Sequence, residues 1–330
     1  MTDEFSTAQG DQIVPSERQK PYRVLLYYKY VKVADHVAYA ARHLEFCKEL
    51  GIKGRILIAP EGINGTCSGT VEQCDRYISH MEQDEYFSGM KYKVDEVDGH
   101  VFKKLFVRAK DELVTFRVDY DLDPNKEVGQ YLKPKEWKEM LERDDVIVVD
   151  ARTDYEYDIG HFRGAIRPDG VTSFREFPKW VRDNLEQYKD RPVMTYCTGG
   201  IRCEKFTGFL LKEGFKNVYH LEGGIVTYGK DPETQGELWD GKCYVFDERI
   251  AVPIGEKAGD VAGRCKYCGT ARDLIQNCAN LSCRSQIVIC EECEPKHRGA
   301  CSEACQTAER NIYPYKNKKE WLASQEAVSV

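Results

Sequence analysis

Residues 193–206 read VMTYCTGGIRCEKF, which is an apolar strand followed by a loop with two glycines and the start of a helix. A cysteine at the end of such a strand, here Cys197, lies among backbone N–H groups of the loop and at the positive end of the helix dipole. Arg202 adds a positive charge, and Gly199 and Gly200 let the backbone curl close to the sulfur. Each feature favours the thiolate, which is the nucleophilic form of cysteine. We therefore predict that Cys197 is a catalytic thiol rather than the end of a plain strand before a helix cap.

This loop lies in a region, residues 126–235, in which expected strands and helices alternate. Continuous apolar strands, as in a buried parallel sheet, are expected at Val146–Asp150, Val193–Tyr196 and Val218–Leu221. Helices are expected at Pro134–Glu142, 174–188 and Cys203–Gly214. This alternation predicts a doubly wound α/β domain.

Further motifs flank the loop: Asp150-Ala151-Arg152, Glu156-Tyr157, Gly160-His161-Phe162-Arg163-Gly164-Ala165 and Leu221-Glu222-Gly223-Gly224-Ile225. Together with the cysteine loop, they resemble the signature of the rhodanese family. The resemblance implies a rhodanese-type fold whose active-site cysteine can carry a persulfide. Asp150 and Arg152 follow a strand at the edge where α/β domains bind ligands, and we expect them to support the loop through an ion pair.

The length of the loop separates two kinds of chemistry. Arg202 lies five positions after Cys197, whereas the related dual-specificity phosphatases have their arginine one position later. In this chain Cys203 occupies that later position, so phosphatase chemistry is disfavoured. Cys203 is either a resolving thiol for Cys197 or a helix residue that packs inward, and both interpretations stay open.

Residues 21–120 predict a smaller α+β unit. Strands are expected at Val24–Tyr30, Lys53–Ala59, Tyr92–Val97 and Leu105–Arg108, and helices at Asp35–Leu50 and Val71–Met81. We expect a glycine-rich turn at Glu61-Gly62-Ile63-Asn64-Gly65, leading into Thr66–Gly69. The order β-α-β-β-α-β fits a ferredoxin-like fold. Asp121–Asn125 is polar and contains a proline, so it is the expected linker to the α/β domain.

Several segments outside the cysteine loop point to one family. They are Glu61–Thr66 with Ser68-Gly69, Phe102–Lys110 followed by Glu112, and Cys243–Arg249. Together with the loop, these segments resemble the bacterial oxygen-dependent tRNA uridine hydroxylases, which are oxidoreductases. The resemblance implies that the protein hydroxylates the wobble uridine of tRNA to 5-hydroxyuridine, with molecular oxygen as the co-substrate and tRNA as the partner.

The cysteine loop can support this reaction in two ways. The thiolate of Cys197 can add to C6 of uracil, which leaves electron density at C5, while Arg202 and backbone N–H groups stabilise the oxyanion. Alternatively, Cys197 carries a persulfide. No motif for a flavin, haem, iron centre or nucleotide cofactor is evident. Two other interpretations are a sulfurtransferase that passes sulfur from Cys197 to an acceptor, and a non-enzymatic zinc scaffold, which the complete loop disfavours.

RNA contacts are expected on the N-terminal unit. Its basic side chains can face phosphates, and Tyr27, Tyr28, Tyr30 or Tyr92 can stack on bases. The basic candidates are Lys53, Arg55, Lys103, Lys104, Arg108 and Lys110. The competing interpretation is that the lysines are simply solvated and the strand tyrosines belong to a core.

Residues 263–310 contain eight of the fourteen cysteines, in four closely spaced pairs. The pairs are Cys265 with Cys268, Cys278 with Cys283, Cys290 with Cys293, and Cys301 with Cys305. Four pairs suit two structural zinc ions, each held by four thiolates, and a reducing compartment disfavours four disulfides. The spacing does not fix the pairing. By analogy with other two-zinc modules, the first and third pairs would share one ion, and His297 would be a bystander.

The composition sets the remaining limits. The chain has 330 residues, 42% of them hydrophobic, which suits two or three domains. A net charge of −7 argues against bulk coating of nucleic acid but allows a local basic face. No apolar run is long enough to span a bilayer and no signal peptide is evident, so we expect a cytoplasmic protein without membrane contact. Residues 1–20 are expected to be a disordered lead-in, 236–262 a connector and 311–330 a tail that is basic around 316–319. These patterns carry no signal of oligomeric state.

Overall fold

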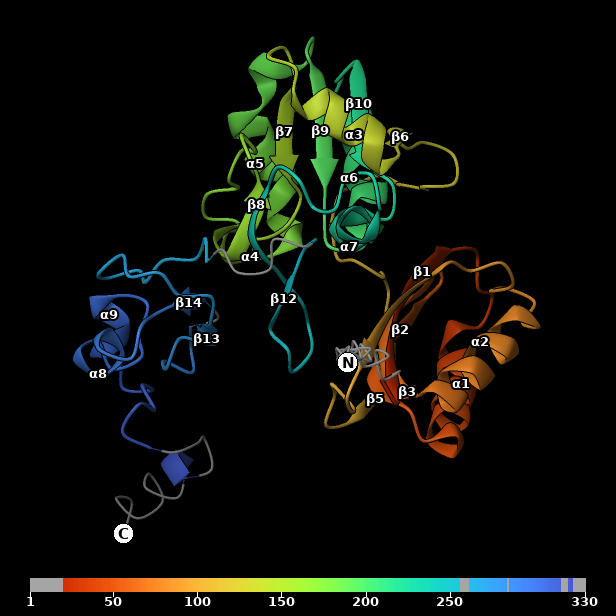
Figure 1. The fold of residues 1–330 in the computed structure, drawn as a ribbon, viewed down its shortest axis with the longest axis horizontal. Helices are drawn as coiled ribbons and strands as arrows, with labels where there is room; N and C mark the ends of the chain where they lie inside the picture. The colour runs from red at the N-terminus through yellow and green to blue at the C-terminus, as the bar shows by residue number, and fades with distance from the viewer. Residues whose placement is uncertain (1–19, 256–260, 284, 316–319, 323–330) are drawn as a thin grey trace, which may run out of the picture.

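The computed structural model describes residues 20–255, 261–283, 285–315 and 320–322. Figure 1 shows an N-terminal α+β domain in red and orange, a larger α/β domain in yellow and green, and a small module in blue. Most of the predicted lead-in, residues 256–260 of the predicted connector and the basic part of the predicted tail lie outside the described residues. Within the described part of the chain, no helix is long and apolar enough to cross a membrane.

The N-terminal domain is a five-stranded sheet with both helices on one face (Figure 1). Its elements are β1 (Tyr22–Tyr30), α1 (His36–Leu50), β2 (Lys53–Ala59), β3 (Gly62–Thr70), α2 (Val71–Glu82), β4 (Tyr92–Val97) and β5 (Leu105–Ala109). The strand order is β4-β1-β3-β2-β5, in which β5 runs parallel to β2 and the other neighbours are antiparallel. This arrangement confirms the ferredoxin-like prediction, and the strand predicted at Leu105–Arg108 is β5, a fifth strand at one edge of the sheet. The face without helices is turned toward the α/β domain.

One expectation for this domain is wrong. The segment Gly62–Thr70 is not a glycine-rich turn but a central strand, paired with β1 on one side and β2 on the other. Its glycines serve close packing instead: a Cβ on Gly65 would lie 2.5 Å from the Tyr27 ring, and one on Gly62 would lie 2.0 Å from the carbonyl oxygen of Lys29. Sequence rules assign glycine runs to turns because they do not see such close neighbours.

The α/β domain is built on a parallel sheet of order β6-β10-β9-β7. Its elements are β6 (Gln130–Leu132), α3 (Pro134–Leu141), β7 (Ile147–Asp150), α4 (Asp154–Ile159), β8 (Gly160–Phe162), α5 (Phe177–Asn184), β9 (Pro192–Tyr196), α6 (Ile201–Lys212), β10 (Asn217–Leu221) and α7 (Gly224–Lys230). Short 3-10 turns flank α5, at Phe174–Glu176 and Glu186–Tyr188, so the predicted helix 174–188 is broken in three.

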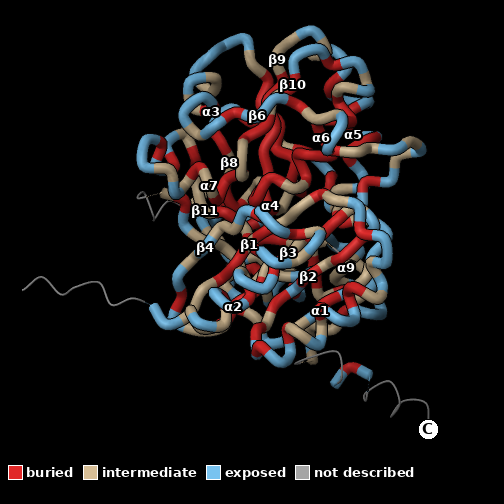
Figure 2. The backbone as a smooth tube through the Cα atoms, turned by 90° about the vertical axis from the view of Figure 1, so that its right-hand side faces the viewer, coloured by how far each residue is buried: buried red, intermediate tan, exposed pale blue. Residues whose placement is uncertain are grey.

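Hydrophobic cores lie on both faces of this sheet, as a doubly wound domain requires. Along β7, Ile147 and Val149 pack into the core that contains α5 and α6, and Val148 packs into the core that contains α3 and α7. Figure 2 shows the buried backbone running through the strands of both domains. Residues 197–200, at the end of β9, are all buried.

The predicted connector contains a hairpin, β11 (Trp239–Tyr244) and β12 (Ala251–Pro253), of which β11 also pairs with β8. The tip of the hairpin reaches the N-terminal domain, where the Arg249 Nη1 lies 2.9 Å from Asp95 Oδ2. The blue module follows, with β13 (Ile275–Asn277), β14 (Gln286–Val288), α8 (Cys293–Lys296) and α9 (Glu303–Gln306).

Candidate active site and metal centre

The sulfur of Cys197 lies in a loop of backbone donors. Cys197 directly follows β9, and the N–H of Gly200 donates to its Sγ over 3.1 Å. Gly200 has a φ of 103°, a left-handed conformation that suits glycine, and it lets the chain turn into α6 within three residues. The helix therefore starts immediately behind the sulfur, as the sequence predicted.

The environment stabilises the thiolate of Cys197 although the residue is fully buried. Burial alone raises the pKa of this thiol, but the Cys203 thiol, the charge of Arg202 and the backbone N–H groups of Arg202 and Cys203 lower it to about 5. Burial and the neighbouring Cys197 raise the pKa of Cys203 well above its ordinary value. Cys203 is therefore a thiol that donates to the thiolate, and it is also packed inward in the core of the domain.

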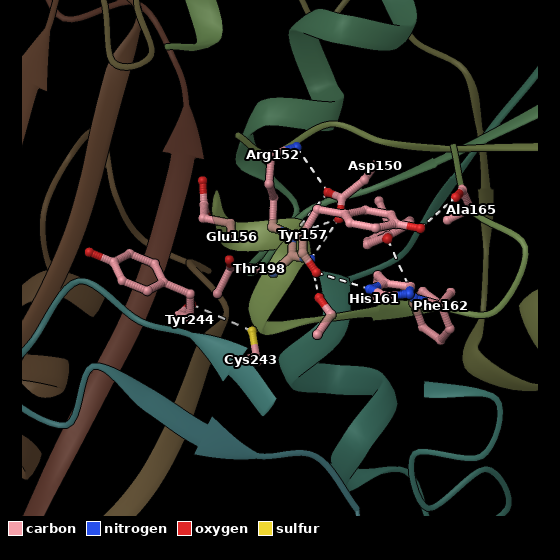
Figure 3. A network of polar contacts seen from close by, with 12 residues as sticks. Asp150, Arg152, Glu156, Tyr157, His161, Phe162, Ala165, Thr198, Cys243 and Tyr244 are labelled. Carbon is pink, nitrogen blue, oxygen red and sulfur yellow. Dashed lines mark hydrogen bonds and ion pairs between the residues drawn. The ribbon is translucent and has the colours of Figure 1, made fainter. Parts of the chain in front are cut away.

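Arg202 has a second partner besides the sulfur. Its guanidinium makes two hydrogen bonds to the buried carboxylate of Glu156, of 2.8 and 2.9 Å, and one of 3.3 Å to the Thr198 hydroxyl. Although burial opposes it, the Arg202 charge lowers the pKa of Glu156, so the pair is ionic. Glu156 thus holds the Arg202 guanidinium beside the loop. Figure 3 shows the Glu156 side chain near Thr198 and Arg152.

Asp150 and Arg152 form a fully buried ion pair beneath the loop (Figure 3). The guanidinium of Arg152 bonds both carboxylate oxygens of Asp150 and donates to the carbonyl of Gly160 over 2.7 Å. It also lies 5.3 Å from the ring centre of Trp239 on β11. The pair therefore joins β7, the start of β8 and the hairpin, and makes no contact with the Cys197 sulfur that the structure records.

The start of α7 supports the loop from the other side. The backbone N–H groups of Ile225 and Val226 donate to the carbonyls of Cys197 and Thr198. A Cβ on Gly224 would lie 2.5 Å from the Cys197 carbonyl oxygen, and the φ of this residue is 70°. Only glycine suits this position, which explains the Leu-x-Gly-Gly motif in physical terms.

The N-terminal domain closes the site, and sequence reasoning missed this. Leu26 on β1 packs against Gly199, where a Cβ would lie 3.1 Å from the Leu26 side chain. Tyr28, also on β1, donates from its hydroxyl to Glu204 over 2.8 Å, and Tyr131 donates to the same carboxylate over 2.7 Å. The partners are too distant in the chain for any local pattern to reveal them.

A buried lysine next to this contact, Lys205, forms ion pairs between the α/β domain and the N-terminal domain. Lys205 is only 4% exposed, and its Nζ lies 2.9 Å from Glu61 and 3.0 Å from Glu112. Both carboxylates belong to segments that carried the sequence resemblance outside the loop. These separate motifs therefore meet at one ionic contact between the domains.

A small cavity of about 40 Å³ lies beside the loop, between three parts of the chain. The N-terminal domain contributes Lys93 and Leu26, the loop contributes Thr198, and the hairpin contributes Phe246 and Arg249. Phe246 is 48% exposed and lies under the Arg202 guanidinium, 5.9 Å from ring centre to Cζ. None of these five residues was a candidate site residue in the sequence analysis, although Phe246 and Arg249 belong to the segment Cys243–Arg249 that carried the family resemblance.

The predicted base-stacking tyrosines are not available for stacking. Tyr27 is fully buried, Tyr92 packs against the same core, and Tyr28 and Tyr30 point into the domain interface. The exposed aromatic ring of this domain is instead Phe106, which pairs with Arg55 in register and lies 5.1 Å from Arg108.

The basic candidates gather on and around the β2–β5 edge. Arg55, Lys104, Arg108 and Lys110 are exposed, Lys53 is half-buried, and Lys103 pairs with Glu248 over 2.9 Å. Because Ile56 points into the helix-side core, Arg55 and its register partner Phe106 lie on the face without helices.

The cysteine-rich module brings its eight cysteines into two groups. Cys265, Cys268, Cys290 and Cys293 form one group, and Cys278, Cys283, Cys301 and Cys305 form the other, with the sulfurs of each group within 4.8 Å of one another. These are the interleaved groups expected by analogy. His297 lies outside both groups and stacks on Tyr267.

The geometry of both groups fits a tetrahedral metal ion. Neighbouring sulfurs lie 3.5 Å apart between Cys268 and Cys290 and 3.6 Å apart between Cys283 and Cys301. A tetrahedron with metal–sulfur bonds of about 2.3 Å has edges of roughly 3.8 Å. The N–H of Cys290 donates to Cys265 Sγ over 3.3 Å, which suits a thiolate ligand. The two groups can therefore hold a metal.

The thiolate state of Cys197 can be measured directly. We predict that the ultraviolet absorbance of wild type minus Cys197→Ser shows a thiolate that titrates with a midpoint near pH 5. Arg202→Gln should move this midpoint upward by about 1 to 3 pH units, because an opposite charge is lost. Cys243→Ser should leave it in place, because burial raises the pKa of Cys243 to about 12 and this residue stays a thiol. A wild-type midpoint at the ordinary thiol value would contradict the prediction.

The buried pair beneath the loop should be essential for stability. Arg152→Met leaves the Asp150 charge without its partner, so we expect the free energy of unfolding of the α/β domain to fall by about 3–5 kcal/mol. Urea unfolding followed by tryptophan fluorescence measures this. Arg143→Gln breaks an exposed pair with Asp145 and should change little. Equal effects of the two substitutions would argue against the structural importance of the buried pair.

Comparison with known proteins follows the same division of the chain. Family models match a UPF0176 acylphosphatase-like domain at residues 22–113, a rhodanese-like domain at 133–231 and a rhodanase C-terminal domain at 240–306. These matches confirm the predicted rhodanese-type domain and its ferredoxin-like neighbour. Among solved structures, a rhodanese-like domain from Anabaena sp. is 20% identical, covers 42% of this chain and 96% of its own, and has a TM-score of 0.29.

Curated relatives extend over nearly the whole chain. The tRNA uridine(34) hydroxylase of Bacillus licheniformis is 58% identical over 292 residues, which cover 88% of this chain and 90% of the relative. The protein of the same name from Staphylococcus carnosus is 55% identical over 296 residues, which cover 90% of this chain and 93% of the relative. The chain therefore belongs to the tRNA uridine(34) hydroxylase family.

Proposed function

We propose that the protein is an oxidoreductase that hydroxylates the wobble uridine of tRNA to 5-hydroxyuridine with molecular oxygen. The observation that carries the proposal is the thiolate loop of Cys197, enclosed by the N-terminal domain, in a chain 58% identical to a tRNA uridine(34) hydroxylase. The same loop without that domain would fit any rhodanese, because a fold alone does not name a substrate.

The chemistry begins with the sulfur. In our proposal the Cys197 thiolate adds to C6 of uracil, and the electron pair of the C5–C6 double bond moves toward the C4 oxygen. The backbone N–H groups of the loop and Arg202 stabilise the negative charge that develops. C5 is then electron-rich and reacts with molecular oxygen: one oxygen atom stays on C5 and the other leaves as water. The two electrons that this requires come from the thiols of Cys197 and Cys203, which end joined in a disulfide. Cys203 is the proposed resolving thiol, since it already donates to the Cys197 sulfur.

The base must leave the tRNA stack to reach the sulfur. The cavity of about 40 Å³ holds no more than a few water molecules, which is too little for a pyrimidine ring. We propose that the hairpin tip with Phe246 and Arg249 moves when the base enters. Its polar contacts with the N-terminal domain are few: the exposed Lys103–Glu248 pair, the half-buried Arg249–Asp95 pair and one backbone hydrogen bond from Glu248 to Val101.

The tRNA backbone is proposed to lie along the β2–β5 edge. Phe106, between Arg55 and Arg108, can stack on a base while the arginines contact phosphates. The proposed phosphate contacts are Lys53, Arg55, Lys103, Lys104, Arg108 and Lys110. A sulfurtransferase that carries a persulfide on Cys197 is the second candidate function, because the same donors would stabilise a persulfide anion.

We propose one structural zinc ion in each cysteine group. Four thiolates are the usual ligands of structural zinc, and none of the fourteen cysteines forms a disulfide in the structure. Each ion would join short segments that have little hydrophobic core of their own.

Two further proposals complete this assignment. We place the protein in the cytoplasm, where tRNA is the substrate and thiols stay reduced. The proposed divisions of the chain are residues 21–120, 126–235, 236–262 and 263–310, with residues 1–20 as lead-in and 311–330 as tail.

Nucleoside mass spectrometry tests the function. Unmodified tRNA incubated aerobically with the protein should yield 5-hydroxyuridine, and Cys197→Ala should abolish the product. Cys47→Ala, a substitution in the core of the N-terminal domain, is the matched control and should retain activity. The absence of product, together with intact sulfur transfer from thiosulfate, would favour the sulfurtransferase instead.

Metal analysis tests the zinc proposal. We expect about two zinc ions per chain, one for each group. Cys268→Ser and Cys283→Ser should each lower the content by about one, since each removes a ligand from a different group. Cys74→Ser should leave the content unchanged, because Cys74 lies in the N-terminal core. A wild-type protein that is purified under reducing conditions and contains no metal would refute the proposal.

A further inference from the structure

One positive charge beside the active site has no carboxylate partner in contact. Lys93 on β4 lies opposite Leu26 of β1, so both side chains lie on the same face of the sheet. This is the helix-free face, which packs against the cysteine loop. Its Nζ lies 5.2 Å from the centre of the Tyr28 ring. Among the described residues, no ion pair or hydrogen bond is recorded for this ammonium group.

The nearby carboxylates are already engaged. Glu204 on α6 accepts from Tyr28 and Tyr131, and Glu222 after β10 pairs with the neighbouring Lys91. On the cavity wall, Arg249 of the hairpin pairs with Asp95 and Asp247. The remaining anion that acts on Lys93 is the thiolate of Cys197, which together with Glu204 raises the pKa of this lysine.

Burial has the opposite and larger effect. It lowers the pKa of Lys93 to about 8, despite the Cys197 and Glu204 charges. Such a lysine is charged at neutral pH yet releases its proton readily, as a general acid must. Lys93 lines the cavity together with Thr198, the residue that follows Cys197. A base bound at the sulfur would therefore meet the ammonium group.

We infer that Lys93 is a catalytic acid, supplied by the N-terminal domain, that binds O4 of the uracil attacked by Cys197. This inference rests on the proposed function. As the bond from sulfur to C6 forms, the C5–C6 π pair moves toward O4, and the ammonium group gives its proton to that oxygen. The products are a neutral enol adduct and a neutral lysine amine, with no change of oxidation state. The amine takes the proton back when the adduct breaks down.

The experiment compares kcat and KM for unmodified tRNA from about pH 6 to about pH 9. The wild-type rate should fall as pH rises past about 8, because the acid loses its proton. Lys93→Gln should lower kcat by roughly 10²-fold or more at neutral pH, with little change in KM. Lys93→Arg retains the charge but does not deprotonate in this range, so it should keep more activity and lose the alkaline fall. Lys48→Gln removes an exposed lysine on α1, on the opposite face of the same sheet, and should behave as wild type.

Two results would overturn the inference in an active enzyme: a kcat of Lys93→Gln within about twofold of wild type, or an unchanged alkaline fall in Lys93→Arg. A wild-type protein that forms no 5-hydroxyuridine would refute the proposed function separately. In that case the titration of the Cys197 thiolate still tests whether the Lys93 ammonium group faces the sulfur. Lys93→Gln should move the Cys197 midpoint upward because a facing cation is lost, and an unmoved midpoint would overturn the inference.

Discussion

The constraint on which this structure depends is a negative charge on a buried sulfur. Taking a thiolate out of water is costly, and burial alone would keep Cys197 protonated at neutral pH. The loop offsets this cost with backbone N–H groups, the Cys203 thiol and Arg202. Arg202 is itself a buried charge, so Glu156 must hold it. The charge of one sulfur thus accounts for a chain of partners that reaches from α6 to α4.

The cysteine loop is also shielded from solvent by another domain. A rhodanese-type loop lies at the surface end of its sheet, yet Cys197 is fully buried because the helix-free face of the N-terminal sheet lies over it. The N-terminal domain is held in this position by the ion pairs of Lys205 with Glu61 and Glu112 and by the hydrogen bond from Tyr28 to Glu204. Exclusion of water strengthens the electrostatic interactions inside the site and protects a reactive adduct from side reactions.

The sequence was most informative where a function depends on neighbours in the chain. The loop from Cys197 to Arg202 could be predicted, because the strand, the glycines, the arginine and the helix follow one another directly in the sequence. The paired cysteines likewise predicted two tetrahedral groups. The predictions that were wrong or missing concern features that depend on residues far apart in the sequence. The glycines of β3 resembled a turn because their reason, the ring of Tyr27, belongs to another strand. Lys93 carried no signal at all, because its thiolate partner lies about a hundred residues further along the chain.

The division of the site between domains bears on specificity. Neither domain alone encloses the cavity: the α/β domain supplies Thr198, next to the proposed nucleophile Cys197, the N-terminal sheet supplies Lys93, and the hairpin supplies Phe246. A base that enters must displace the hairpin tip and still allow the sheet to remain over the loop. A small sulfur donor would need neither the acid nor the aromatic wall. The lysine acid and the aromatic wall are therefore better explained by a nucleobase substrate than by sulfur transfer, although both reactions use the same thiolate.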